Sequence, residues 1–295
     1  MRIVSLVPHA TELLFALGLG DRVVGVTHEC DYPSDAAALP HVTRDRLPAG
    51  LSAAEIDAAV RERTEQGEAI YSLDEQLLAE LRPTLIITQA LCPVCAVSYD
   101  DVAAVAKRLD PKPELIALDP KTLGETMGDI RTVAQATDEK DAAMELVARQ
   151  RSRIDAVRLA VRKERPRTVV ALEWLDPVFV AGHWTPQLIE LAGGVDLLGF
   201  AGEASEQMSW EAVAAAKPEV VLCIPCGYDA EGSLEQARRY EERLRALGAR
   251  EIIALDASAY FSRPGPRLVD GLETLAHALH PGVVADAPGA VLRLG

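Results

Sequence analysis

The stretch "DEKDAAMELVARQRSRIDAVRLAVRKER", residues 138–165, decides the expected fold of this 295-residue chain. It contains no Gly or Pro, begins with acidic residues and ends with basic ones, so its end charges complement the dipole of one long helix. At 1.5 Å per residue such a helix would span about 40 Å, which is enough to bridge two lobes. The stretch therefore predicts a helical connection between two halves of the chain.

Strand and helix signals alternate on both sides of this stretch. The N-terminal side opens with an apolar run, "RIVSLV", followed by a helical pattern, "ATELLFALG", and the alternation restarts after Pro166 with "TVVALEW". The apolar runs are continuous, as expected for parallel strands covered on both faces by helices. An additional helix is predicted at about 52–66.

The sequence thus predicts an α/β fold with two Rossmann-like lobes, each built on a parallel sheet, joined by one long spanning helix. The predicted segments are an N-terminal lobe at 1–136, an interlobe helix at 137–166 and a C-terminal lobe at 167–295. Within the second lobe a charged helix is expected at about 234–247, and the tail from Pro281 onward is expected to be extended.

Composition excludes several classes of protein. Hydrophobic residues make up 49% of the chain and charged residues 25%, enough for well-packed cores. The formal net charge of −15 argues against a nucleic-acid partner. No apolar run is long enough for membrane insertion, and the N-terminus opens on a strand pattern without signal-peptide features. A cytoplasmic location is predicted, or a periplasmic or extracellular one if a leader was removed.

The five cysteines are one single residue and two C-x-x-C pairs, a spacing that suits a reducing compartment. Both pairs follow apolar strands, where ligands of open parallel sheets collect. Thiolate and imidazole groups suit zinc, copper(I), an iron–sulfur cluster, or the cobalt or iron of a macrocycle; redox dithiols and inert buried cysteines are the alternatives. The predicted metal ligands are His28, Cys30, Cys92, Cys95, His183, Cys223 and Cys226.

Aromatic residues gather in predicted loops after strands although they form only 4% of the chain. This pattern predicts a flat, apolar ligand contacted by Trp184, Tyr228, Tyr260 and Phe261. Arg263, in a Pro/Gly-rich loop, would either pin a carboxylate, amide or phosphate of that ligand or cap a neighbouring loop. The common hydrolase, zinc-peptidase and nucleotide-binding motifs are missing from the sequence, which favours a binding protein over an enzyme.

Three blocks carry a family resemblance: "RIVSLVPHATELLFALGLGDRVVGVTHECDYP", "FVAGHWTPQLIELAGG" and "YFSRPGPRLVDGLETLAHAL". Together with the long helix, they resemble the helix-linked (class III) solute-binding proteins of ABC transporters, most of all the cobalamin-binding members, over nearly the whole chain. The resemblance implies two lobes that close around a corrinoid, siderophore or haem. It implies ligand contacts by Tyr32, Tyr260 and Arg263, and docking of Glu75 and Glu211 onto arginines of the membrane permease.

The chain also departs from this family. Ala259 stands where the cobalamin-binding relative has an aspartate, and the cysteine pairs and the helix at 52–66 are additions. The main hypothesis is a cytoplasmic, non-enzymatic binding protein that holds cobalamin, another corrinoid or a related metal-containing ligand between its lobes. One alternative is a cytoplasmic metal or iron–sulfur redox protein or enzyme on the same scaffold. The other is an exported ABC importer component whose leader is missing.

Overall fold

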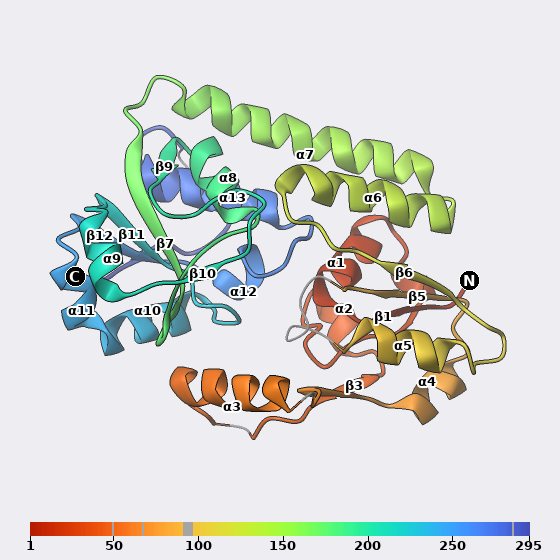
Figure 1. The fold of residues 1–295 in the computed structure, drawn as a ribbon. Helices are drawn as coiled ribbons and strands as arrows, with labels where there is room; N and C mark the ends of the chain where they lie inside the picture. Colours follow the sequence, from red (N-terminus) through yellow and green to blue (C-terminus); the bar gives the residue numbers. More distant parts are fainter. Residues whose placement is uncertain (49, 67, 91–96, 285) are drawn as a thin grey trace. The chain divides into compact units, whose positions relative to one another are not determined.

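The computed structural model describes residues 1–48, 50–66, 68–90, 97–284 and 286–295 (Figure 1). Its contacts divide the chain into two compact units. The N-terminal unit comprises Met1–Pro120 and Met127–Leu146, and the C-terminal unit comprises Lys121–Thr126 and Val147–Gly295. The predicted boundaries of the three segments stay a prediction.

The N-terminal unit is built on a four-stranded parallel sheet in the order β2-β1-β5-β6. Its strands β1 and β5 are buried along their whole length, which explains their continuous apolar sequences. The parallel sheet predicted from the first half of the sequence is therefore confirmed. The strands are β1 (Ile3–Ser5), β2 (Val23–Gly25), β5 (Leu85–Thr88) and β6 (Glu114–Ala117).

Helices α1 (Pro8–Ala16), α2 (Ser34–Ala37), α4 (Glu75–Leu81) and α5 (Tyr99–Ala106) complete this unit around its sheet. Helix α1 starts with Pro8, which has no amide hydrogen to leave unpaired, and it is followed by Gly18 in the left-handed region at φ 76°. A short 3-10 helix, Gly20–Arg22, leads into β2. Leu78 of α4 and Val102 of α5 pack with Ile86 of the sheet in one apolar core.

An antiparallel pair, β3 (Thr43–Asp45) and β4 (Tyr71–Leu73), carries helix α3 (Ala53–Glu65) between its strands. The helix predicted at 52–66 is therefore confirmed. Ser52 and Glu55 form a capping box, in which the side chain of each accepts from the backbone amide of the other. The two strands were not predicted because three residues are too few to show a period.

Two consecutive helices, α6 (Leu123–Thr137) and α7 (Lys140–Val161), occupy the middle of the chain. The long helix expected over 138–165 is confirmed as α7, with shorter ends, because Asp138 adopts a left-handed conformation at φ 59° and interrupts the helical run. Helix α6 was not predicted. The boundaries between the two units fall inside both helices.

The C-terminal unit contains a seven-stranded mixed sheet in the order β10-β8-β7-β11-β12-β13, with β9 also paired to β7. Strands β9 (Gly194–Asp196), β11 (Val220–Cys223) and β12 (Glu251–Ala254) extend the parallel core from β7 (Arg167–Leu175). The sheet was expected to be wholly parallel, but β8 (Val178–Val180), β10 (Glu206–Gln207) and β13 (Leu292–Arg293) are antiparallel. The tail is thus partly a strand.

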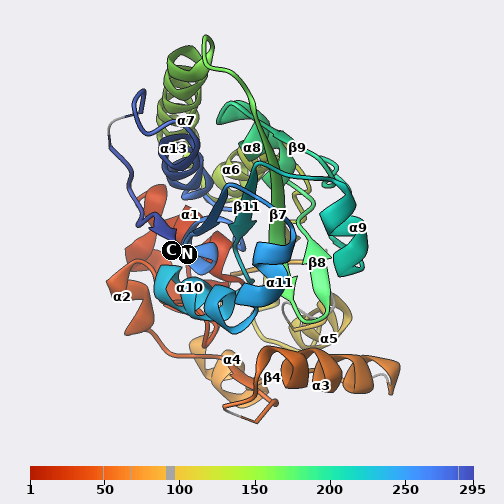
Figure 2. The same cartoon turned by 90° about the vertical axis from the view of Figure 1, so that its left-hand side faces the viewer.

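Helices cover both faces of this sheet. Val170, Leu172 and Val221 point to a core formed with α9 (Trp210–Ala215), α10 (Ala230–Arg239) and α11 (Glu241–Ala246). The residues that alternate with them, such as Val169, face the other side. Helices α8 (Thr185–Leu191) and α13 (Leu268–Leu279) pack together (Figure 2). The charged helix expected at 234–247 is two helices, because Tyr240 separates α10 from α11.

Arg153 of α7 ties that helix to α13 within the C-terminal unit. Its guanidinium lies 2.5 Å from Asp270 and 2.6 Å from Glu273, and these hydrogen bonds raise the pKa of Arg153 above its ordinary value. In the described part of the chain, no helix combines the length and the apolar character that crossing a membrane requires.

Candidate functional site

In the N-terminal unit, the loop after β2 presents His28 in a fixed orientation. The His28 Nδ1 atom lies 2.7 Å from the hydroxyl of Thr43, and its ring centre lies 5.2 Å from that of Tyr71. The hydroxyl of Tyr71 donates to Glu29 at 3.1 Å. Thr43 and Tyr71 belong to β3 and β4, so this small sheet positions the imidazole. Because Nδ1 is engaged, Nε2 is the nitrogen that can contact a ligand.

Cys30 and Tyr32, from the same loop, differ sharply in exposure. Cys30 is 2% exposed, and its sulfur lies 3.1 Å from the hydroxyl of Thr11 and 3.5 Å from that of Thr27. It therefore packs among hydroxyl groups in the interior of the unit. Tyr32 is 48% exposed, which leaves its ring accessible to a ligand.

In the C-terminal unit, Glu173 lies near the carboxyl end of β7 with a perturbed carboxyl group. Burial raises the pKa of Glu173 to about 7, against the opposing effect of its hydrogen bond with Ser205. The Ser205 hydroxyl also accepts from the Gly182 amide at 3.2 Å. Nothing in the sequence singles out Glu173, because a glutamate in an apolar strand carries no signal of the burial that its folded neighbours impose.

His183 and Trp184 follow directly in the loop before α8. The His183 amide donates to the carbonyl of Glu203 at 2.6 Å, and burial is the main cause that lowers the pKa of its imidazole. The Trp184 indole is 7% exposed and donates to the Phe261 carbonyl at 2.7 Å, while Phe261 is 4% exposed. Both aromatic side chains lie in the packed interior, and their predicted contact with a ligand stays a prediction.

Tyr228 and Arg263 lie on loops of this unit, whereas Tyr260, expected in a loop, is the last residue of helix α12 (Ala257–Tyr260); all three are partly exposed. The Tyr228 ring centre lies 6.3 Å from that of Trp174. Tyr260 is held by the tail, because its ring leaves no room for a Cβ at Gly289.

The two cysteines of the second C-x-x-C pair have different environments. Cys223 was expected in a loop, but it is the last residue of β11, is fully buried in the apolar core, and has a pKa raised to about 12 by burial. Its thiol is therefore protonated and poorly suited to bind a metal. Cys226 is exposed in the following turn. Cys92 and Cys95 lie outside the described residues.

No three His, Cys, Asp or Glu side chains converge on one possible metal position within the ranges that the structure covers. The zinc and iron–sulfur predictions therefore receive no support. A metal carried inside an organic ligand would need fewer protein groups than a bare ion.

Glu75 and Glu211, the predicted docking residues, both lie in the first turn of a helix, as expected. Glu75 opens α4 and pairs with Arg108 at 2.9 Å. The pKa of Glu211 in α9 is lowered, first by a hydrogen bond with its own backbone and then by one with Ser209. Both side chains are exposed, so they present carboxylates to solvent.

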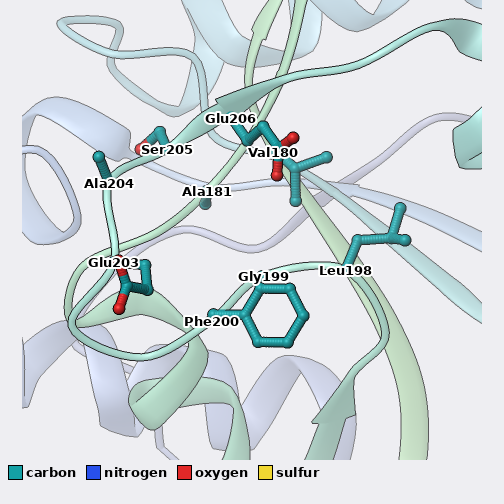
Figure 3. Close-up of a pocket in the computed structure, with 9 residues that line it drawn as sticks. All are labelled: Val180, Ala181, Leu198, Gly199, Phe200, Glu203, Ala204, Ser205 and Glu206. Carbon is teal, nitrogen blue, oxygen red and sulfur yellow. The ribbon is translucent and has the colours of Figure 1, made fainter.

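A pocket of about 380 Å³ opens in the C-terminal unit beside the loop from Leu198 to Glu206 (Figure 3). Its apolar residues include Phe200, which is 67% exposed, and its acidic residues are Glu203 and Glu206. None of the predicted site residues that the structure describes lines it. The lining residues are Val180, Ala181, Leu198, Gly199, Phe200, Glu203, Ala204, Ser205 and Glu206.

Comparison with known proteins finds similarity to vitamin B12-binding and haem-binding proteins. A vitamin B12-binding protein of Vibrio cholerae serotype O1 is 24% identical over 274 residues, which cover 92% of this chain and 86% of that protein. The periplasmic haem-binding protein RhuT from Roseiflexus sp. RS-1, in its apo form, is 29% identical with a TM-score of 0.69, and the match covers 95% of this chain and 98% of that one.

The structure of the periplasmic vitamin B12 binding protein BtuF of Vibrio cholerae has a TM-score of 0.68 at 23% identity, covers 95% of this chain and 96% of that one, and shows a shared fold. Because such relatives are periplasmic, the expected cytoplasmic location finds no support. A family model described as periplasmic binding protein matches residues 3–258. The chain therefore belongs to the periplasmic binding protein family, and its α/β architecture is that of the helix-linked solute-binding proteins.

Proposed function

We propose that this protein is the solute-binding component of an ABC importer and that its cargo is a corrinoid such as cobalamin. The observation that carries the proposal is the alignment with a vitamin B12-binding protein over 92% of the chain. A protein in this role works outside the cytoplasm, where it delivers its cargo to a membrane permease.

The charges at the strand ends support a corrinoid over haem. Glu29 lies in the loop after β2, and the whole chain carries a formal net charge of −15. Haem presents two anionic propionates, which such a surface repels unless basic residues compensate. The amide groups at the rim of a corrinoid are neutral and pair with both donors and acceptors. The protein surface therefore suits the amide-bearing ring better.

We propose three residues as contacts for this cargo. The exposed ring of Tyr32 can pack on the flat macrocycle. Arg263 can donate to the oxygens of its amides or phosphate. His28, held through Nδ1 by Thr43, offers Nε2 as an axial ligand for cobalt.

Haem is the second candidate, because the haem-binding protein RhuT shares 29% identity with this chain over nearly its full length. Parallel visible-absorption titrations with aquocobalamin and with haemin distinguish the two. We expect saturable, equimolar binding of aquocobalamin and weaker binding of haemin. Tighter binding of haemin would reverse the order of the candidates, and failure of both to bind would overturn the proposed function.

The axial role of His28 has its own test. On binding to the wild type, aquocobalamin should show a shifted absorption band, because imidazole replaces water on cobalt. His28→Gln should abolish the shift, while His41→Gln, an exposed histidine of the same unit, should keep it. A shift that survives in His28→Gln would assign the axial position to another group.

The carboxylates of Glu75 and Glu211 are proposed to dock onto the permease. In reconstituted transport, Glu75→Ala and Glu211→Ala should each lower uptake at least fivefold without changing cargo affinity, because both side chains are exposed and lie outside the cargo contacts. Glu235→Ala, at an exposed position of α10, is the matched control. Normal uptake by the double variant would refute the docking role.

A further inference from the structure

We propose that the pocket beside the loop from Leu198 to Glu206 is a second binding site, which takes a small organic cation consisting of a guanidinium or ammonium group on an apolar arm. The proposal goes beyond the corrinoid function, because this pocket lies wholly within the C-terminal unit and contains none of the proposed cargo contacts.

The size and walls of the pocket fit the apolar arm. Its volume of about 380 Å³ falls within the range of small-molecule sites, roughly 300 to 1,000 Å³. Val180 and Leu198 form apolar walls, and Figure 3 shows the Phe200 ring across the space from Val180. An aromatic ring left 67% exposed beside a pocket offers its face to a cation as well as to an alkyl chain.

The polar groups around the pocket are acidic. Glu203 and Glu206 are among the lining residues, and no Lys, Arg or His belongs to the lining residues that the structure describes. Figure 3 shows the Glu206 carboxylate beside Val180, on the side of the pocket. A planar guanidinium can therefore bind carboxylate and aromatic ring at once, which an anion cannot do here.

Asp196 provides a third carboxylate, which lies behind the residues that line the pocket. Asp196 uses Oδ1 to accept from the amides of Leu198 and Gly199, at 3.0 and 2.8 Å. Its Oδ2 atom is buried, and none of the described residues provides it with a hydrogen-bond partner. A Cβ at Gly199 would come within 2.7 Å of this oxygen, so the carboxylate lies directly against a lining residue. Its negative potential adds to that of the two glutamates.

The basic residues near this loop belong to other parts of the unit. The loop of His183 packs against the segment from Gly202 to Glu203, and Lys121 lies near enough to His183 to lower its pKa. Neither residue lines the pocket. The ammonium of Lys121 limits the affinity for a cation without filling the site.

The test compares butylguanidinium with butylurea, which has nearly the same shape but no charge. Amide chemical-shift titration of the full isotopically labelled chain measures both affinities, and the shifts should centre on Gly199, Gly202 and Ser205. We expect millimolar binding of butylguanidinium and at least fivefold weaker binding of butylurea. Equal affinities, or shifts that centre elsewhere, would overturn the proposal.

Variants locate the contacts. Glu203→Gln and Glu206→Gln should each weaken butylguanidinium about two- to fivefold, the effect expected of a partly exposed ion pair. Phe200→Leu, which keeps an apolar side chain, should weaken it by a similar factor because it removes the cation–π contact. Glu235→Gln is the charge-matched control and should bind like the wild type. If Glu203→Gln, Glu206→Gln and Phe200→Leu bind butylguanidinium as tightly as the Glu235→Gln control, the pocket is not the site.

A further titration distinguishes a free small cation from an arginine side chain of a partner protein. N-acetylarginine amide carries the same guanidinium on a peptide-like stem. If butylguanidinium binds and N-acetylarginine amide does not, the occupant is a free small cation. If N-acetylarginine amide binds more tightly, the pocket is still a cation site, but its occupant is an arginine side chain of a partner protein.

Discussion

Replacing Glu173 by glutamine should make the C-terminal unit more stable at alkaline pH and leave it nearly unchanged at pH 4.5. Burial raises the pKa of this carboxyl from 4.5 to about 7. Between these pH values the folded state holds a proton that the unfolded state has lost, so the free energy of unfolding falls as pH rises through this window. Glutamine stays neutral, and it keeps an oxygen that can accept from the Ser205 hydroxyl.

The size of the effect follows from the same pKa values. At about 1.4 kcal/mol per pH unit, the rise from 4.5 to about 7 corresponds to about 3 kcal/mol. Because Glu173 is partly exposed, we expect water to reduce this to about 2 kcal/mol above pH 8. A gain of about 2 kcal/mol in the free energy of unfolding is large for a substitution that replaces a carboxyl group with an amide of nearly the same shape.

Tryptophan fluorescence provides a selective assay. All three tryptophans, Trp174, Trp184 and Trp210, belong to the C-terminal unit. Urea unfolding of wild type and Glu173→Gln should be followed by this signal from pH 4.5 to 8.5, with Glu235→Gln as the exposed control. The stability difference should grow through the window and level off above pH 7. Parallel pH profiles for wild type and Glu173→Gln would refute the reasoning.

Three further predictions concern the same unit. Arg153→Met should lower the free energy of unfolding by about 1 to 3 kcal/mol, because it leaves two half-buried carboxylates of α13 without their cationic partner. In the same urea assay, Arg158→Met, which removes an exposed ion pair, should lower it by less than about 0.5 kcal/mol. Trp184→Phe should cost about 1 to 3 kcal/mol by thermal unfolding, since a buried carbonyl loses its donor. Native labelling with a maleimide at pH 7.5, read by peptide mass spectrometry, should modify Cys226 at least tenfold faster than Cys223; equal rates would contradict the buried placement of Cys223.

Much of the fold was predictable because its signals are local. The run at 138–165 without Gly or Pro contains α7, and continuous apolar runs mark β1, β5, β7 and β11. Strands of two or three residues, such as β10 and β13, were missed because they exist only through pairing with a longer neighbour. Sequence spacing alone does not encode that pairing.

The candidate site was less predictable, because its properties depend on burial. Trp184 and Cys223 looked like loop residues facing a ligand, yet tertiary packing places both in the interior. Glu173 and Phe200 carried no functional signal in the sequence, since their environments come from loops distant in sequence. Residue types after strands pointed to one edge of the sheet, but not to which side chains stay accessible there.

The discontinuous makeup of the C-terminal unit limits how the protein can be dissected. A fragment beginning at Val147 would lack Lys121–Thr126, which belongs to the same unit. It would leave the side-chain oxygen of Gln187 without the Leu123 amide that donates to it at 2.9 Å. Autonomous expression of this half thus requires the short upstream segment to be supplied, for example as a complementing peptide or by circular permutation, and a simple truncation should be less stable than the same residues in the intact chain.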